Sequence, residues 1–482
     1  MKFSFVNPPL NTEVSAREKK KMIGASPPMG ILYVASFLSN HGIEVSLLDA
    51  TAKNLTTIAT ANWITKENPD IVGFSTLTCT SRTAPQIAKQ AKQAKQAKQE
   101  NPNLTTVLGG LHATYNPTKI LKKYPWIDII VRGEGEQTAL ELTKTLEKDS
   151  SLKDVQGITF RNNGNIISTS DRPLIKDVDT IPFPDRMLLD TEYHALAAGI
   201  NAAPKKYTSF VTSRGCVYNC RFCGIRALAH NIWRPRSVEN ALEELLLLES
   251  QGYRQFHFVD DNFMLNQKRA IKLCQEIRRE KLDVDWICLG RVDNCSYPML
   301  KELVRAGCKI IHFGIESANQ RMLDYYNKRI TPQQSITAIK AARKAGVDVI
   351  IGSLIVGAPD ETPQEIQNTL EFAKKLQLDI PEINILAATP GVDIWDELKT
   401  NGTLDEDEYW ETGVLIPEIS PNAVPLEEIN RMIHEHLRHF LLRPSFMMEE
   451  ILKTFKSTYR LNLLINNLTR VGTILENARF FA

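Results

Sequence analysis

The 482-residue sequence lacks several features that would assign it to a broad class at once. It has no apolar run long enough to span a membrane, and its net charge of +2 favours neither nucleic acid nor a membrane surface. The first residues lead directly into Pro8-Pro9 and do not resemble a signal peptide. Eight cysteines in a chain this long do not indicate a disulfide framework, so we expect a cytoplasmic protein with reduced thiols.

Short apolar strands alternate with helical stretches twice along the chain, which predicts an α/β protein. The first alternation, over residues 1–150, predicts a Rossmann-like, doubly wound domain of five parallel strands with ligands at their carboxyl ends. Residues 151–200 are expected to form a hairpin and a proline-containing linker. Six β/α units over 201–400 predict a partial barrel, whose active site should also lie at the strand carboxyl ends, and 401–482 a helical C-terminal region.

Three cysteines lie within eight residues, directly after the first predicted barrel strand. Cys216, Cys220 and Cys223 have the spacing Cys-x3-Cys-x2-Cys. Three thiolates this close can hold three corners of a cubic 4Fe-4S cluster and leave one iron open, whereas electron-transfer clusters are closed by four cysteines. Zinc would require a fourth ligand nearby, which this stretch does not supply. The other five cysteines are expected to be small buried side chains.

Polar or glycine-containing segments follow the next barrel strands in order. Taken singly, an Asp-Asp or Glu-Ser pair is usually a helix cap, and a glycine-rich strand end is usually a turn. Their occurrence on successive strands after the cysteine loop indicates one common site. The segments are Val259-Asp-Asp-Asn-Phe263, Gly290-Arg-Val-Asp293, Gly314-Ile-Glu-Ser317, Tyr325-Tyr-Asn-Lys-Arg329 and Gly352-Ser-Leu-Ile-Val-Gly-Ala-Pro359.

This ordered set resembles the radical S-adenosylmethionine (SAM) enzymes from the cysteine loop to about residue 390. The resemblance implies a 4Fe-4S cluster held by the three cysteines. It also implies reductive cleavage of SAM to a 5'-deoxyadenosyl radical that abstracts hydrogen from an unactivated carbon. Residues expected to bind SAM are Phe222 at the adenine, Asp260, Asp261 and Asn262 at the amino group, Arg291 at the carboxylate, Glu316 and Ser317 at the ribose, and Gly352 at the adenosyl group.

The front domain has no Gly-x-Gly-x-x-Gly after its first strand, so a dinucleotide site is not expected. Its strand ends instead resemble those of cobalamin-binding radical SAM proteins, a group with C-methyltransferases and the anaerobic magnesium-protoporphyrin monomethyl ester cyclase. In this resemblance the double glycine leaves room for the benzimidazole tail. The Asp-x-His-x-x-Gly segment that often supplies a cobalt ligand is missing, and His112 is expected to be a loop residue. Residues expected to bind cobalamin are Asn7, Pro8, Pro9, Asp49, Ser75, Leu77, Gly109, Gly110 and Glu134.

The resemblance implies C-methylation through methylcobalamin, with a small-molecule or lipid-like substrate and an electron donor such as flavodoxin or ferredoxin. Radical ring formation, oxidative cyclisation or rearrangement of a lipid-like or tetrapyrrole substrate would use the same cofactors, and the sequence does not separate these reactions. A non-catalytic cobalamin or redox sensor is disfavoured, because it would not need a SAM-ready barrel. The amphipathic stretches Ile429–Leu442 and Phe446–Phe455 are expected to pack on the barrel or, as an alternative, to cover a lipid-like or polycyclic substrate as a lid.

Overall fold

The computed structural model describes most of the chain as two compact units. The first comprises Met1–Tyr193 with Asp407–Leu415, and the second His194–Glu406 with Ile416–Ala482. No helix in the described part of the chain is long and apolar enough to cross a membrane. The described residues are 1–11, 26–98, 103–197, 200–201, 203, 205–407, 409 and 424–467.

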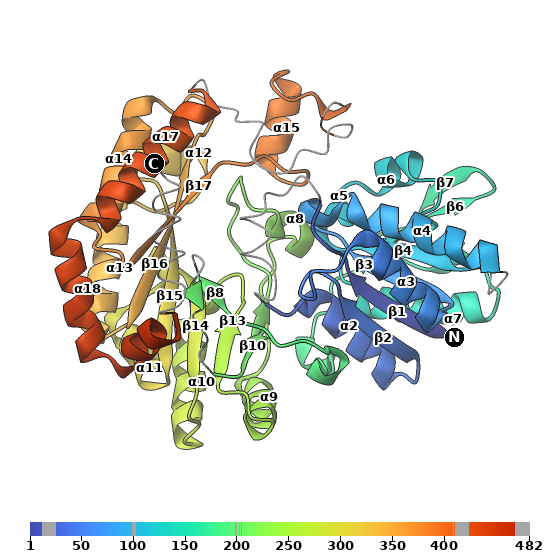
Figure 1. Cartoon of the computed structure of the whole chain (residues 1–482), viewed down its shortest axis with the longest axis horizontal. Helices are drawn as coiled ribbons and strands as arrows, with labels where there is room; N and C mark the ends of the chain where they lie inside the picture. Colours follow the sequence, from blue (N-terminus) through green and yellow to red (C-terminus); the bar gives the residue numbers. More distant parts are fainter. Residues whose placement is uncertain are drawn as a thin grey trace. The chain divides into compact units, whose positions relative to one another are not determined.

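The first unit contains a seven-stranded sheet in the order β2-β1-β3-β4-β5-β6-β7 (Figure 1). Its first five strands are parallel, as predicted, and β6 and β7 add to the sheet edge in antiparallel pairing. The predicted hairpin is therefore part of the first sheet and not of a separate linker region. The strands are β1 (Lys2–Asn7), β2 (Glu44–Asp49), β3 (Ile71–Ser75), β4 (Thr105–Gly109), β5 (Ile129–Val131), β6 (Ile158–Asn162) and β7 (Asn165–Ser168).

Helices flank this sheet because the chain must cross from the end of one parallel strand to the start of the next, and helices form these crossovers. An apolar core forms where α3 and α4 meet the strands, with Ile64, Ile87 and Val72 fully buried. The helices are α2 (Met29–Asn40), α3 (Thr57–Glu67), α4 (Thr83–Lys98), α5 (Leu111–Tyr115), α6 (Pro117–Lys123) and α7 (Glu136–Glu147).

The second unit contains the predicted partial barrel, six parallel strands in sequential order (Figure 1). Large aromatic side chains such as Phe256, Trp286 and Phe313 point outward into the core between strands and helices. The strands are β10 (Tyr207–Phe210), β13 (Gln255–Phe258), β14 (Asp285–Arg291), β15 (Cys308–Glu316), β16 (Val349–Val356) and β17 (Ile380–Ile385). The covering helices are α9 (Val238–Ser250), α10 (Gln267–Arg279), α11 (Tyr297–Arg305), α12 (Gln320–Tyr325), α13 (Pro332–Ala345) and α14 (Pro363–Lys375).

The C-terminal helices pack on the barrel, as predicted. Helix α17 (Leu426–Leu441) contacts α14 through Ile429, Ile433 and Leu370. After α18 (Pro444–Lys456), the chain is helical again over 458–467.

These last helices contact the amino-terminal ends of the barrel strands. Lys453 and Arg460 bind the Asp379 carboxylate just before β17, at 3.0 and 2.7 Å, and Ser457 bonds to Asp348 just before β16. Active sites of such barrels lie at the carboxyl ends of the strands, on the opposite side of the barrel. These contacts argue against the alternative of a substrate lid, which the sequence placed on 429–442 and 446–455.

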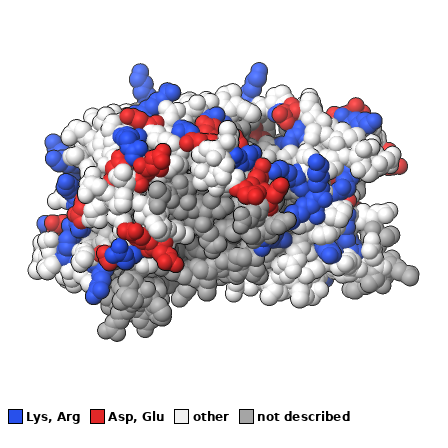
Figure 2. Space-filling model, turned by 90° about the horizontal axis from the view of Figure 1, so that it is seen from above, with Lys and Arg blue, Asp and Glu red and all other residues white. Residues whose placement is uncertain are grey.

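Charges of both signs share the surface. On the face drawn in Figure 2, Lys and Arg side chains are interspersed with Asp and Glu side chains. This distribution matches the small net charge of +2.

Candidate functional site

The cysteine loop is closed at its base by a short antiparallel pair, β11 (Ser213–Arg214) with β12 (Arg234–Pro235). Gly215 begins the loop at φ +84°, and a Cβ there would collide with the Ile232 carbonyl, so the position requires glycine. Because the two strands pair, residues 215–233 form a single closed loop at the carboxyl end of β10.

Two acidic side chains hold the start of this loop. Asp260 is buried and accepts hydrogen bonds from the backbone N–H groups of Thr212 and Ser213 at 2.6 and 2.9 Å. Asp261 accepts one from the Gly215 N–H at 2.9 Å. Both residues therefore position the cysteine loop, and a contact of either with SAM remains a prediction.

The three cysteine side chains lie close enough to perturb one another. Burial raises the pKa of Cys216, and raises that of Cys223 to about 11, with further increases from the neighbouring cysteines. The Cys216 and Cys223 thiols are therefore protonated before metal binds, and their binding as thiolates must release protons. No three His, Cys, Asp or Glu side chains of the described residues converge as a single metal ion would require. Three thiols in one loop suit a cluster with one open corner, since a structural zinc site has four protein ligands.

Arg291, at the end of β14, points toward this loop. Its guanidinium makes a two-pronged ion pair with Asp293, at 2.9 and 3.1 Å. It also donates to the Lys328 carbonyl at 2.5 Å and to the Cys220 sulfur at 3.6 Å. Since Asp293 takes the fork that a SAM carboxylate would use, the predicted carboxylate role of Arg291 lacks geometric support.

A network that the sequence did not reveal connects the loop to the next two strands. Tyr218 exchanges hydrogen bonds with Asn294, and Asn294 accepts one from the Asn262 amide at 2.8 Å. The Asn262 side-chain oxygen is buried and has no donor among the residues that the structure describes. A buried acceptor without a donor is costly, so this oxygen fits the predicted contact with the SAM amino group.

Further orphaned polar atoms surround the same loop. They are buried without a partner among the described residues and are Ser213 Oγ, Asn219 Oδ1 and Tyr326 Oη. Buried polar atoms are paired in most native structures, so each exception calls for an explanation such as a functional role or a bound group. The residues present therefore fit a polar ligand beside the three thiols.

Glu316 and Lys328 form a buried ion pair at 2.6 Å at the end of β15. Glu316 has φ +64°, a left-handed conformation that is strained for a side-chain-bearing residue and is enriched at functional sites. Gly314 makes room for the pair, because a Cβ there would lie 2.7 Å from the Lys328 ammonium. Phe222 packs edge-on against Tyr326, with ring centroids 5.5 Å apart. Glu316 thus lies beside the loop and Phe222 within it, and their contacts with SAM stay predictions.

Two residues predicted to bind SAM, Ser317 and Gly352, have packing contacts in the layer between strands and helices. The Ser317 hydroxyl bonds to Thr369 on α14 at 3.0 Å, in the layer between strand and helix. Gly352 is required because a Cβ would lie 2.5 Å from Leu378 and 2.7 Å from Ile315, both in the outward core. Ser317 and Gly352 serve packing, and the expectation that they touch SAM is not supported by their placement.

The inward face of the barrel carries polar side chains that sequence reasoning missed. His312 on β15 pairs with Glu382 on β17 at 3.0 Å. Ser353 on β16 lies 3.4 Å from Glu382 and accepts from Asn384 at 3.2 Å. Alternation along each strand would have predicted a shared face, but only the register of three strands brings these groups together.

In the first unit, the predicted cobalamin residues at the ends of β1 and β2 are bonded to one another. The Asn7 amide donates to Asp49 at 2.8 Å, and the Tyr193 hydroxyl donates to the other Asp49 oxygen, also at 2.8 Å. The carbonyls of Pro8 and Pro9 accept bonds from Thr51 and Thr83. The strand ends that were predicted to bind cobalamin are therefore held in place by hydrogen bonds within the protein.

The double glycine after β4 has two different roles. Gly110 has φ +92°, and a Cβ there would lie 2.7 Å from the Thr76 carbonyl oxygen. The Thr76 backbone therefore occupies the space beside Gly110 that was predicted for the benzimidazole tail. At Gly109 a Cβ would meet ordinary contacts at 3.8 Å or more. Ser75 ends β3 beside this turn, and the Leu77 side chain is 44% exposed. An exposed apolar side chain at the carboxyl edge fits packing against a large cofactor.

His112 lies on α5 and is buried, and burial lowers its pKa to about 4. It is thus a neutral helix residue at neutral pH. Glu134 accepts a hydrogen bond from the Ile175 N–H at 3.0 Å and so anchors the irregular segment 172–177 near α7. These contacts give Glu134 a structural partner, and its predicted cobalamin contact stays a prediction.

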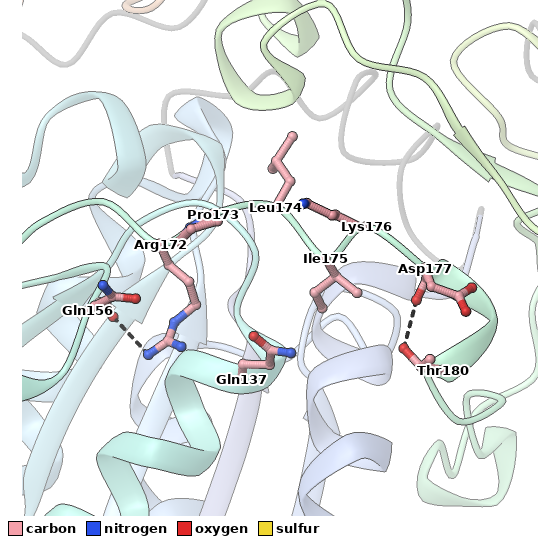
Figure 3. A pocket seen from close by; sticks show the side chains of 9 residues that line it. All are labelled: Gln137, Gln156, Arg172, Pro173, Leu174, Ile175, Lys176, Asp177 and Thr180. Carbon is pink, nitrogen blue, oxygen red and sulfur yellow. Dashed lines mark hydrogen bonds between the residues drawn. The ribbon is translucent and has the colours of Figure 1, made fainter.

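An open polar hollow of about 430 Å³ lies beside that segment (Figure 3). Arg172 is one of its lining residues, and its guanidinium is held by Thr138, Glu141 and the Gln156 carbonyl. Of the predicted cofactor residues none lines the hollow. The site geometry therefore rests on the strand ends and not on this hollow.

Comparisons with known proteins agree with this division. The radical SAM superfamily model matches residues 210–373, and the B12 binding domain model matches residues 22–143. An uncharacterized methyltransferase of Pyrococcus horikoshii is 36% identical over 453 residues, which cover 94% of this chain and 95% of the relative. The chain belongs to the cobalamin-binding radical SAM family.

Another relative is named as a cyclase. The anaerobic magnesium-protoporphyrin IX monomethyl ester cyclase of Rubrivivax gelatinosus is 29% identical, over 89% of this chain and 76% of the cyclase. The structure of the radical SAM methyltransferase TsrM from Kitasatospora setae superposes with a TM-score of 0.65 at 16% identity, covering 83% of this chain and 75% of TsrM. The latter likeness confirms the predicted fold.

Family membership makes this protein a radical SAM enzyme whose cofactors are a 4Fe-4S cluster, SAM and cobalamin. The residues present fit the first two through the three thiols and the orphaned polar atoms of the second unit. In the first unit they fit cobalamin through backbone shape and exposed Leu77 at the carboxyl edge.

Proposed function

We propose that this protein is a cobalamin-dependent radical SAM C-methyltransferase. When bound, the reduced cluster and SAM supply a 5'-deoxyadenosyl radical, and cobalamin supplies the methyl group. The observation that carries the proposal is the three-thiol loop with orphaned polar atoms around it, in a chain 36% identical over almost its full length to a protein described as a methyltransferase.

The chain's own residues would act by positioning. Cys216, Cys220 and Cys223 hold the cluster, and Asp260 and Asp261 fix the loop that presents them. Asn262 is proposed to accept from the SAM amino group, because its buried oxygen has no protein donor among the described residues. Burial of this region excludes water from reactive species.

The polar inward face of the barrel is proposed to meet the substrate. His312, Ser353, Glu382 and Asn384 lie on neighbouring strands, and the first three are partly buried whereas Asn384 is exposed. They offer hydrogen-bond donors and acceptors to a polar group of a small-molecule or lipid-like substrate. We also propose a one-electron donor such as flavodoxin or ferredoxin, and a cytoplasmic location, since the thiols must stay reduced to bind iron.

Oxidative cyclisation is the second candidate, because the 29% identical relative is a cyclase. Two products separate the candidates without knowledge of the substrate. The reconstituted protein with cobalamin, SAM and a strong reductant should form both S-adenosylhomocysteine, from methylation of cobalamin, and 5'-deoxyadenosine. A cyclase would form only the second product, and a sensor would form neither, so absence of S-adenosylhomocysteine would overturn the methyltransferase proposal.

A further inference from the structure

Arg291 is held in place more completely than a ligand-binding arginine needs to be. Two of its N–H groups bond to the Asp293 carboxylate, and one more bonds to the Lys328 carbonyl. Its guanidinium also lies 3.6 Å above the Tyr218 ring, and its side chain is only 7% exposed. The group is thus fixed on three sides and shielded from water.

The remaining contact of this guanidinium is with a cluster ligand. Nη1 lies 3.6 Å from the Cys220 sulfur, within hydrogen-bonding distance for a sulfur acceptor. Cys220 is the middle cysteine of the loop and a buried one. Because the Tyr218 ring packs against the guanidinium, residues of the loop itself help aim the cation at the sulfur.

We propose that Arg291 is a positioning residue that raises the reduction potential of the cluster by donating a charged N–H···S hydrogen bond to Cys220. This inference rests on the proposed cluster site of the three cysteines. When one electron enters the cluster from the donor, the thiolate sulfurs gain negative charge. A nearby N–H donor and a shielded positive charge stabilise that reduced form, and such bonds to sulfur are known to tune cluster potentials.

Asp293 should act in the opposite direction. Its carboxylate holds the guanidinium in place but also offsets part of its charge. Loss of Arg291 therefore removes a positive charge that stabilises the reduced cluster and should lower its reduction potential. Loss of the Asp293 charge leaves more of the positive charge of Arg291 acting on the cluster and should raise that potential. Opposite signs of shift at two residues in direct contact are a result that a merely structural role would not produce.

The test is a redox titration of the reconstituted full-length protein without SAM, followed by the electron paramagnetic resonance signal of the reduced cluster. The variant R291M should have a more negative midpoint potential than wild type, and R291K, which keeps the charge without the planar fork, a smaller shift in the same direction. D293N should shift the potential to more positive values. The matched control is R226Q, which removes a cation of the same loop that pairs with Asp393 and is 32% exposed.

Unchanged potentials in R291M and D293N, or shifts of the same sign, would overturn the inference. If R291M does not retain four irons, D293N decides alone: a positive shift supports the inference and no shift overturns it. A wild-type protein that binds no cluster at all refutes the proposed function itself. A wild type with a full cluster whose potential ignores both substitutions refutes only the role of Arg291.

Discussion

The two units present their predicted cofactor residues in different ways. At the barrel edge, buried polar atoms such as Asn262 Oδ1 and Tyr326 Oη have no partner among the described residues, and Glu316 is held at φ +64°. In the first unit, Asn7 and Asp49 bond to each other and to Tyr193. The barrel site therefore contains buried polar atoms that a ligand could pair with, whereas these residues of the first unit already bond to one another. Each variant below changes one unit, and where possible a property of the other unit serves as the control.

The largest effect is expected from replacing Cys216, Cys220 and Cys223 with alanine. Without three thiolates the cluster has no ligands, so iron content, brown colour and 5'-deoxyadenosine formation should be lost. Cobalamin binding by the first unit, measured from its absorbance, should persist. The control C79A alters a cysteine of the first unit and should keep the cluster; a full 4Fe-4S spectrum in the triple variant would refute the site.

D379N should destabilise the second unit by about 3 kcal/mol, because a buried carboxylate bound by Arg343, Lys453 and Arg460 loses its charge. Burial raises the pKa of Asp379, but the three cations outweigh it and lower that pKa to about 2. A carboxyl with a depressed folded-state pKa stabilises above its unfolded value near 4 and loses this stabilisation as pH falls toward 2.

Wild type and D379N should therefore differ by a constant free energy of unfolding above about pH 5 and converge below about pH 4. Chemical denaturation at several pH values measures this. Cobalamin binding should not change. A difference that grows on acidification would contradict the assignment. The control K399Q, which removes the more exposed ion pairs with Asp396 and Glu406, should show a much smaller pH dependence.

G110A should weaken the first unit by about 1–3 kcal/mol, since the new Cβ meets the Thr76 backbone in a left-handed conformation. Distortion of this turn should reduce cobalamin retention while the cluster spectrum stays intact. The matched variant G109A meets only protein contacts of 3.8 Å or more and should leave the free energy of unfolding nearly unchanged. An equal loss of stability in the two variants would contradict the clash at Gly110.

The smallest effect is expected from N262L, which removes the buried acceptor and its bond to Asn294. Loss of one hydrogen bond to a charged ammonium should weaken SAM binding about tenfold, or about 1.4 kcal/mol, with the cluster retained. Equilibrium binding of SAM to the reconstituted protein measures it. N266A removes only the N-cap of α10 and should lower stability without changing SAM affinity.

The β/α alternation predicted both parallel sheets because strand and helix periodicities are local properties of the sequence. Local spacing likewise predicted the cysteine loop. Asp260 and Gly352 show where local reasoning stops: a residue next to a strand end can face the ligand, the loop backbone or the outer core. Which of these it faces depends on packing with distant segments such as Thr212 and Leu378.

The sequence by itself determined the fold class, the three-thiol loop and the family, since each depends on residue types at short spacing. Only the tertiary structure decided that Asp293 occupies the Arg291 fork, that Asn262 keeps an unpaired oxygen, and that the last helices contact the amino ends of the strands. Asp293 is only two residues from Arg291, but the contacts of Asn262 and of the last helices join residues more than 30 apart in the sequence. Such contacts form only when burial of the apolar core has brought the strands together.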